Sequence, residues 1–426
     1  MSKLKIKIDK YIGIYLFIII IIFNGFITNF VRIGDKNWGT ILNDGLIVFF
    51  LIRYIFLVKW RALKGFYQIN PMIILFIIYI ISTIFVSIVS YKSMYEFLGG
   101  IRNHILYYMM FIVFYNFFII NGKISIQKIY KFISSSTLII CAYGILQYCC
   151  QNILPKEFLT LNDATQFTIM GITNYRSNGL IGDMLAFGGF TVISMLMNLS
   201  YLINTRAKKK QYLILLIPTI ACIFSYSRIS ILLYFAIMFG FYILNANKKV
   251  ANKLLVLIGV LILLIFFILY TDLGQGLLQR FTNIDINNSS DAPRLETYIR
   301  AIILIKDNMF WGLGFGTQMT CALDMGKRII TDGYWWECML DLGIPCFIFL
   351  MLFIIFSIIR IGFINKKIPM KYSRTYLSTY FFVAIYFFIA SFLNSALEAK
   401  INLLLMIILL AMSEASIFFE QHMKYD

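Results

Sequence analysis

Histidine and charged residues are scarce in this chain of 426 residues. The sequence contains 2 histidines and 14% charged residues, whereas soluble domains carry about 25% charged residues. Its 7 cysteines include no C-x-x-C pair, and no cysteines or histidines stand at a metal-ligand spacing. We therefore expect no metal ion or other cofactor, and the low charge argues against a soluble protein.

Long apolar runs are present instead. Hydrophobic residues make up 60% of the chain, and many runs of about 20 residues carry almost no charge, which is the length that crosses a bilayer as a helix. Solid runs also exclude an outer-membrane β-barrel, whose strands are short and alternate in hydropathy. The predicted fold class is all-α, a polytopic membrane protein of about 12 transmembrane helices. The expected spans are 11–31, 41–58, 71–90, 104–120, 129–150, 179–204, 211–226, 229–246, 252–271, 334–359, 375–394 and 397–419.

Lysine and arginine predict the orientation of these spans. The formal net charge is +18, and its cations gather in alternate connections such as "NTRAKKK" and "RIGFINKKIPMKYSR". Under the positive-inside rule this pattern places both termini in the cytoplasm. The basic segment "MSKLKIKIDK" precedes an apolar run without a small-residue cleavage site, so we expect a retained first span. Topology explains the positive charge, and no nucleic acid is expected as a partner.

Two connections are long, and both are predicted to be extracytoplasmic loops of a single membrane domain, 1–426. They cover 151–178 and 272–333. Long loops in compact proteins are usually functional or disordered, so we expect the functional site on this face. The second loop contains the amphipathic segment "RLETYIRAIILIKDNMFWGLGFG", which predicts a helix along the membrane surface.

Arginines mark this same face. Arg228 stands in "SYSRIS", a break with almost no loop between two apolar runs, and Arg176 precedes another span in "NYRSNGLIGDMLAFGG". Arg294 and Arg300 stand in "DAPRLETYIRAIILI". A lone arginine at a span end can snorkel to the interface, and surface ion pairs contribute little. Several arginines beside long loops instead favour an anionic ligand, because a guanidinium can grip a phosphate with two hydrogen bonds.

The glycine-rich stretch "GLGFGT", Gly312–Thr317, does not fit a dinucleotide-binding loop. That fingerprint requires G-x-G-x-x-G after a strand, whereas this stretch reads G-x-G-x-G and follows an amphipathic segment. We expect its glycines to allow a sharp turn and a close approach of the backbone.

Acidic residues stand at the start of the span near 334. Asp332 stands at its mouth in "TDGYWWECMLDLGIPCFIFLML", and Glu337 and Asp341 lie deeper. The neighbouring aromatics fit an interfacial belt, and Asp332 fits a helix N-cap. An acid beside aromatics can also hold a sugar and deprotonate its hydroxyl, and acids within a membrane are functional candidates by default.

In their order, these motifs resemble the O-antigen polymerase/ligase family of bacterial envelope enzymes, which includes Wzy-type polymerases and WaaL-type ligases. The resemblance rests on "YRSNGLIGDMLAFGGF", "SYSRIS", "RLETYIRAIILIKDNMFWGLGFGT" and "DGYWWECMLDLGIPCFIFL", over about 176–352. Two positions depart from the family pattern. Met309 stands where a proline is frequent, and Asp332 stands where ligases carry a histidine. The second departure favours a polymerase.

The resemblance implies a GT-C-like, metal-independent glycosyltransferase in the bacterial cytoplasmic membrane. Such an enzyme joins oligosaccharide repeat units, carried on polyprenyl diphosphate, into O-antigen or capsule, with a flippase and a chain-length regulator as partners. Arg228 and Arg176, with one arginine of the amphipathic segment, would stabilise the leaving diphosphate. Asp332, or else Glu296, would take the proton from the acceptor hydroxyl.

Two other functions remain open. A ligase that moves finished glycan to another acceptor would share the fold and the donor. A flippase or other transporter of lipid-linked oligosaccharide would instead carry charges along a central path, and Asp44, Asp183 and Glu398 keep that interpretation open.

Overall fold

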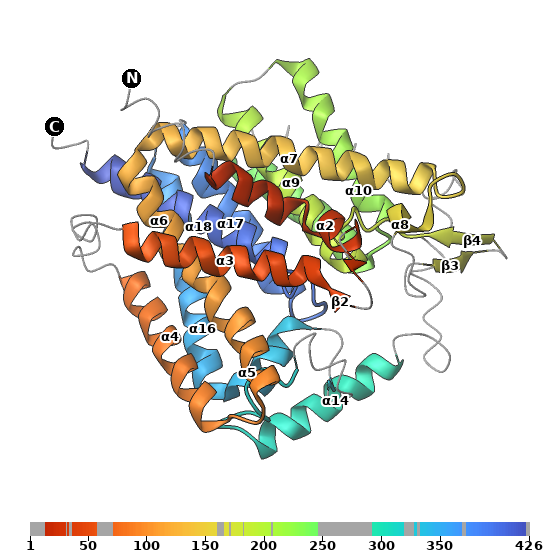
Figure 1. The fold of residues 1–426 in the computed structure, drawn as a ribbon. Helices are drawn as coiled ribbons and strands as arrows, with labels where there is room; N and C mark the ends of the chain where they lie inside the picture. Colours follow the sequence, from red (N-terminus) through yellow and green to blue (C-terminus); the bar gives the residue numbers. More distant parts are fainter. Residues whose placement is uncertain are drawn as a thin grey trace.

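The apolar runs become helices that pack into one bundle in the computed structural model (Figure 1). The structure describes residues 13–30, 32–33, 36–57, 71–159, 166–169, 172–181, 183–205, 208–245, 292–318, 328–329, 333–368 and 372–422. The helices are Gly13–Ile22, α2 (Asn24–Phe30), α3 (Trp38–Leu57), α4 (Pro71–Val89), α5 (Met94–Gly100), the π-helix η2 (Ile101–Leu106), α6 (Tyr107–Asn121), α7 (Lys123–Cys149), α8 (Lys156–Leu159), α9 (Met184–Asn204), the 3₁₀-helix η4 (Lys209–Leu215), α10 (Leu216–Phe224), α11 (Arg228–Asn245), α14 (Ala292–Asp307), α16 (Tyr334–Lys367), α17 (Tyr372–Ala390) and α18 (Lys400–His422).

Two small antiparallel sheets accompany the helices. β1 (Arg32–Ile33) pairs with β2 (Lys36–Asn37), and β3 (Gln166–Ile169) pairs with β4 (Ile172–Tyr175). The connection expected at 151–178 thus contains the short helix α8 and a β-hairpin. Of the longer connection expected at 272–333, residues 272–291 fall outside the described part of the chain.

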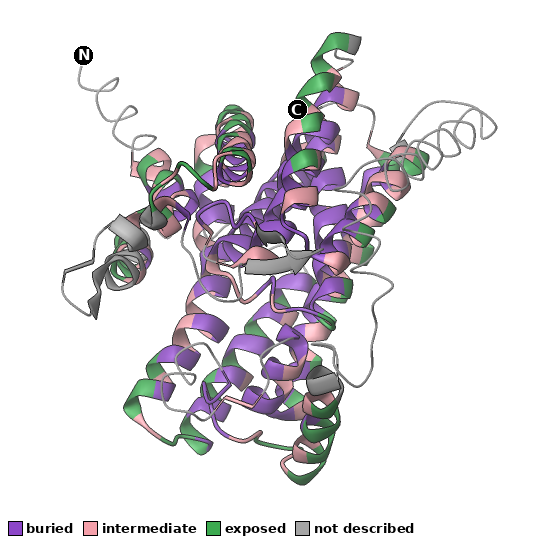
Figure 2. Ribbon diagram, turned by 90° about the vertical axis from the view of Figure 1, so that its right-hand side faces the viewer, coloured by how far each residue is buried: buried purple, intermediate pink, exposed green. Residues whose placement is uncertain are grey.

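Helices α9 and α18 form the centre of the bundle. In their most apolar windows, 89% and 94% of the residues are buried. α18 packs against α6, α17 packs against α9, and α16 packs against α4. Figure 2 shows buried residues along the interior and exposed ones on the outer helix faces. Apolar side chains on those outer faces are expected in a protein whose surrounding solvent is lipid.

The helices fit the polytopic membrane protein predicted from the sequence. Within the described residues, six helices are long and apolar enough to cross a membrane, and three shorter apolar helices accompany them. Every expected span except 252–271, which falls outside the described residues, coincides at least in part with a helix. The count of about 12 spans stays a prediction.

Several chain reversals lie at one end of the bundle. Helices α4, α7 and α10 end there, and α5, α9, α11, α16 and α18 begin there (Figure 1). Backbone contacts join these ends: Phe315 N–H donates to Ser90 O after α4, and Ser177 N–H donates to Phe224 O at the end of α10. We call it the loop end. Tyr334 N–H donates to Asn394 O at 3.3 Å, which joins the start of α16 to the connection before α18. The sequence motifs therefore converge at one end of the molecule.

Helix α16 is broken near its start. Gly343 has non-helical backbone angles, φ 72° and ψ 165°, and a side chain at this position would collide with the carbonyl group of Phe310. Beyond the break, Ile344 N–H donates to Met309 O at 2.8 Å. Non-helical backbone at membrane depth is tolerated only where its polar groups find partners inside the protein, and the segment after α14 supplies one.

The glycine-rich stretch 312–317 approaches protein backbone. Gly312 has φ 69°, and a Cβ atom there would meet the Leu340 carbonyl, while one at Gly316 would meet the Glu96 carbonyl. The expected sharp turn and close approach are confirmed, because this stretch wedges between α5 and α16.

Helix α14 confirms the helix predicted for the amphipathic segment. Its buried face packs through Ala301 against Leu340 of α16, at the lower edge of the view in Figure 1. Its opposite face exposes Ile299, Ile302 and Ile303. An apolar outward face suits a helix that lies along a membrane surface, and that placement stays a prediction.

Candidate functional site

A cavity of ≈ 180 Å³ lies at the loop end of the bundle. Its polar lining consists of Asn24, Arg102, Glu398 and Lys400, and isoleucines supply much of the remainder. Pockets that enclose whole small molecules measure roughly 300–1,000 Å³. This cavity is smaller, so it suits a charged headgroup with an apolar neighbour better than a complete oligosaccharide.

Two cations of the cavity share one carboxylate. Lys400 Nζ lies 2.8 Å from Asp44 Oδ1, and Arg102 Nη1 lies 3.3 Å from Asp44 Oδ2. Tyr107 also donates to Asp44 Oδ1, at 3.2 Å. The three charged side chains are between 17% and 22% exposed. Within this group of three side chains two cations share one carboxylate, which favours an anion beside the cations in a partly desolvated site. The acid of the cavity lining itself is Glu398.

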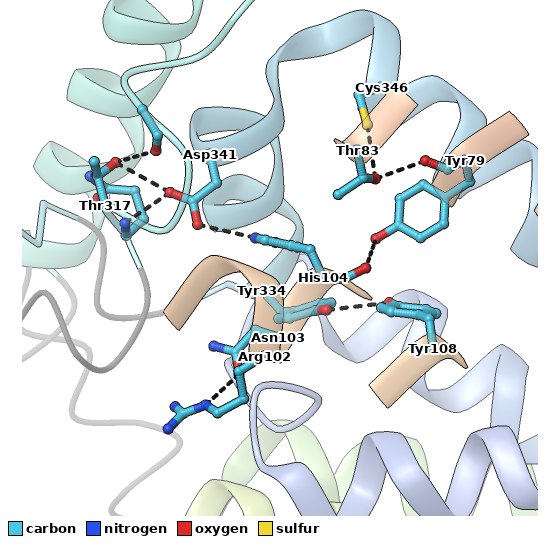
Figure 3. A network of polar contacts seen from close by, with 12 residues as sticks. Tyr79, Thr83, Arg102, Asn103, His104, Tyr108, Thr317, Tyr334, Asp341 and Cys346 are labelled. Atoms are coloured by element: carbon cyan, nitrogen blue, oxygen red, sulfur yellow. Dashed lines mark hydrogen bonds and ion pairs between the residues drawn. The ribbon is translucent and has the colours of Figure 1, made fainter. Parts of the chain in front are cut away.

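The π-helix η2 delivers Arg102 to the cavity. Its sequence is IRNHIL, and it interrupts the run from α5 to α6. π-Helical turns are rare overall, but those that occur often lie at functional sites. Arg102 Nε donates to Asn103 Oδ1 at 3.2 Å, and Figure 3 shows the Arg102 side chain extending away from the contact between His104 and Asp341.

His104 and Asp341 form a buried pair behind the cavity. His104 Nε2 lies 3.1 Å from Asp341 Oδ2, and both side chains are 0% exposed. Asp341 Oδ1 accepts from Thr317 Oγ1 at 3.2 Å and from Gln318 N–H at 2.9 Å. The pair therefore ties the glycine-rich stretch and α16 to η2 (Figure 3), and it holds in place the helix turn that carries Arg102.

A second arginine bridges two acids beside the cavity. Arg328 Nη2 lies 2.6 Å from Glu337 Oε1 and 2.8 Å from Glu398 Oε2. Burial works to lower the pKa of the Arg328 guanidinium, but the carboxylates of Glu337 and Glu398 outweigh it and raise that pKa above its ordinary value. Arg328 therefore stays positively charged and fixes the position of Glu398 at the cavity wall.

Arg176 and Arg228 lie at the same loop end. Ser177 N–H donates to Phe224 O at 3.0 Å, which joins the segment after β4 to the turn between α10 and α11. That turn is tight because Tyr226 adopts a left-handed conformation, φ 49°, an uncommon state for a bulky residue. Arg228 follows it as the first residue of α11.

The remaining predicted residues have different surroundings. Glu296 and Arg300 are exposed on α14. Arg294 belongs to the first turn of that helix, and Asp332 falls outside the described residues. Asp183 was one of the acids that left a transporter function possible. It is the N-cap of α9, and its Oδ2 accepts a hydrogen bond from Ala186 N–H at 3.3 Å.

The cavity is lined by cations other than the four arginines predicted to bind diphosphate. Among the described side chains, Arg102 and Lys400 line it and Arg176, Arg228 and Arg300 do not; the side chain of Arg294 falls outside the described part, and the roles of all four arginines stay predictions. A signal for the missed residues is present in the sequence. Arg102 stands two residues before the expected span 104–120, and Glu398 and Lys400 stand within the expected span 397–419. Charges at such positions are functional candidates by default.

Comparison with known proteins adds one match. Residues 213–338 match the sequence model of a family described as O-Antigen ligase. No curated protein matches the chain. The matched range contains Arg228, α14 and Arg328, and it supports the resemblance to the O-antigen polymerase/ligase group and a role in polysaccharide assembly by an enzyme that acts on lipid-linked sugars. It is compatible with ligases and polymerases alike.

Proposed function

We propose that this protein is a glycosyltransferase that joins lipid-linked oligosaccharide repeat units into a surface polysaccharide. The donor is the growing chain on a polyprenyl diphosphate, and the acceptor is a single repeat unit on the same kind of lipid. The reaction takes place at the loop end, which faces away from the cytoplasm in a bacterial cytoplasmic membrane.

The main support for this proposal is the cavity at the loop end. Its two cations, Arg102 and Lys400, share the carboxylate of Asp44, so an entering diphosphate would meet two cationic groups, while the acid of the lining, Glu398, pairs with Arg328. Isoleucines beside these cations offer an apolar surface to the lipid next to its headgroup. Transition-state stabilisation requires charge placed where the leaving diphosphate develops its negative charge, and Arg102 and Lys400 are suited to that role.

The four arginines predicted from the sequence extend this charge along the loop end. Arg176 and Arg228 belong to adjoining segments there, and Arg300 stands exposed on α14. We propose that they guide the anionic headgroup, whereas Arg102 and Lys400 hold the diphosphate during the reaction. Direct displacement by the acceptor hydroxyl would invert the anomeric centre.

A ligase is the second candidate, because the matched family carries that description. We favour the polymerase because Asp332 stands at the position where ligases of the O-antigen polymerase/ligase family carry a histidine. Within the described residues, His104 is fully buried against Asp341, so it does not replace that histidine at the cavity.

Product analysis separates the candidates. The purified protein is incubated with lipid-linked repeat units extracted from a strain that lacks this gene, and the products are resolved by size. A ladder of repeat lengths on the lipid carrier is the expected result. Transfer of intact chains to a different acceptor, without a ladder, would favour the ligase. Movement of the substrate across a vesicle membrane without extension would favour a transporter.

A further inference from the structure

We propose that Glu398 is the catalytic base that takes the proton from the acceptor hydroxyl. Glu398 lines the cavity together with Arg102 and Lys400. Its side chain is 10% exposed, which is low enough to shield the carboxylate from bulk water and high enough for contact with a bound sugar. This inference rests on the proposed function.

The other acids near the loop end are less suited to this role. Glu337 and Asp341 have 0% exposed side chains, so no substrate reaches them in this conformation. Asp44 is taken up by two cations at 2.8 and 3.3 Å. Glu296 is exposed on α14 and is absent from the cavity lining. Among the described acids, Glu398 alone combines a cavity wall with partial burial.

Arg328 and Glu337 form the support that a base requires. A general base works best when a third group fixes its orientation. Arg328 holds Glu398 Oε2 at 2.8 Å and Glu337 Oε1 at 2.6 Å. Glu337 Oε2 is buried and has no hydrogen-bond partner among the described residues. These contacts fix the orientation of the Glu398 carboxylate at the cavity wall, while Glu337 remains a positioning residue.

The position of Glu398 relative to the cations suits a direct displacement. Glu398 and Lys400 are two residues apart, at the start of α18, so base and diphosphate site lie on one short stretch. The acceptor oxygen forms a bond to the anomeric carbon as its proton passes to the Glu398 carboxylate. The bond from that carbon to the phosphate oxygen breaks, and its electron pair leaves with the diphosphate facing Arg102 and Lys400.

Glu398→Gln tests the assignment through initial rates of chain extension and their dependence on pH. General-base catalysis contributes roughly 10²- to 10⁴-fold, so we expect a loss of that size while binding of farnesyl diphosphate, used as a headgroup probe, stays within about threefold of wild type. Glu420→Gln, at an acid that pairs with Lys123 near the other end of α18, is the control and is expected to keep the extension rate within about tenfold. Asp332→Asn and Glu296→Gln are measured in parallel as rival bases; a loss of about 10²-fold or more in either of them, with none in Glu398→Gln, would overturn the assignment. Charged groups beside Glu398 include Arg328, 2.8 Å from its Oε2, and Glu337 on the same guanidinium.

A second variant keeps the test decisive if Glu398→Gln folds poorly. Glu398→Asp retains the charge and the contact with Arg328 but withdraws the carboxylate, so we expect slower extension with an altered acidic limb of the pH–rate profile. Glu398→Ala should recover activity on addition of formate, which a structural role would not allow. Extension by Glu398→Gln at the wild-type rate with the wild-type pH profile would overturn the base assignment alone. Absence of extension by the wild-type protein would overturn the proposed function itself.

Discussion

Asp44 and Lys400 are 356 residues apart in the chain, yet their side chains lie 2.8 Å apart at the loop end of the bundle. This contact joins α3 to the start of α18. With Arg102 on the other carboxylate oxygen, it brings together the two cations on which the proposed function depends.

Arg102→Gln should slow chain extension by about 10- to 100-fold. A hydrogen bond to a charged group contributes about 1.5–3 kcal/mol, and about 1.4 kcal/mol corresponds to a factor of ten in rate. The matched control is Arg360→Gln. Arg360 is 23% exposed and pairs with Glu414, much as Arg102 is 21% exposed and pairs with Asp44. Equal losses in the two variants would show that Arg102 matters only for folding.

Asp44→Asn should change binding and stability in opposite directions. Two unit charges about 8 Å apart interact by about 2 kcal/mol at an effective dielectric constant of 20, so removing this anion should tighten farnesyl diphosphate binding by about 30-fold. The variant should also lose about 1–3 kcal/mol of unfolding free energy, less than the 3–5 kcal/mol of a fully buried pair, because two cations lose their partner. Weaker binding would contradict an anion site at Arg102 and Lys400.

His104→Asn and Asp341→Asn should each destabilise the protein by about 1–3 kcal/mol, because each leaves a buried polar group without its hydrogen-bond partner. Because the two side chains contact each other directly, the double variant should lose less than the sum of the single losses. Thermal unfolding in detergent measures all three. Additive losses would mean that the pair does not act as a unit in tying the glycine-rich stretch to η2.

Gly343→Ala should destabilise the protein by at least about 1–3 kcal/mol. The residue has φ 72°, and the new methyl group would meet the Phe310 carbonyl; strained left-handed residues alone cost this much. Gly45→Ala is the control, since nothing lies within 4 Å of the added carbon, and it should raise helix stability by about 0.5–1 kcal/mol. Similar unfolding temperatures for both variants would argue against the break in α16.

Arg228→Lys tests the predicted phosphate contact at the turn before α11. Lysine keeps the charge but loses the planar fork that grips two phosphate oxygens, so extension should fall by about tenfold, as expected for one charged hydrogen bond. Arg360→Lys serves as the control. If the Arg228→Lys protein polymerises normally, Arg228 does not grip phosphate through its fork.

The elements that the sequence predicted correctly are those whose formation depends on neighbouring residues. Apolar runs of bilayer length marked the helices, and the amphipathic segment became α14. The glycines of 312–317 were expected to allow a close approach of the backbone, and they lie against the backbone carbonyl groups of Leu340 and Glu96. In each case the physical cause acts over a few neighbouring residues.

The cavity depends on packing, which no local pattern specifies. Arg102 is 58 residues from Asp44, and Arg328 is 70 residues from Glu398. The register that turns Arg102 toward the cavity is set by a π-helix, and π-helices have no sequence signal of their own. The sequence therefore missed the residues that line the cavity, and the extracytoplasmic face of the functional site stays a prediction.

The most direct test of the central claim is the affinity for farnesyl diphosphate in detergent micelles, measured for wild type, Arg102→Gln, Lys400→Gln and Arg360→Gln. We expect both cavity variants to bind at least about tenfold more weakly, as expected for one charged hydrogen bond, while Arg360→Gln binds like wild type and uncharged farnesol shows no such difference. Equal affinity of all four proteins for the diphosphate would contradict the claim that Arg102 and Lys400 hold it.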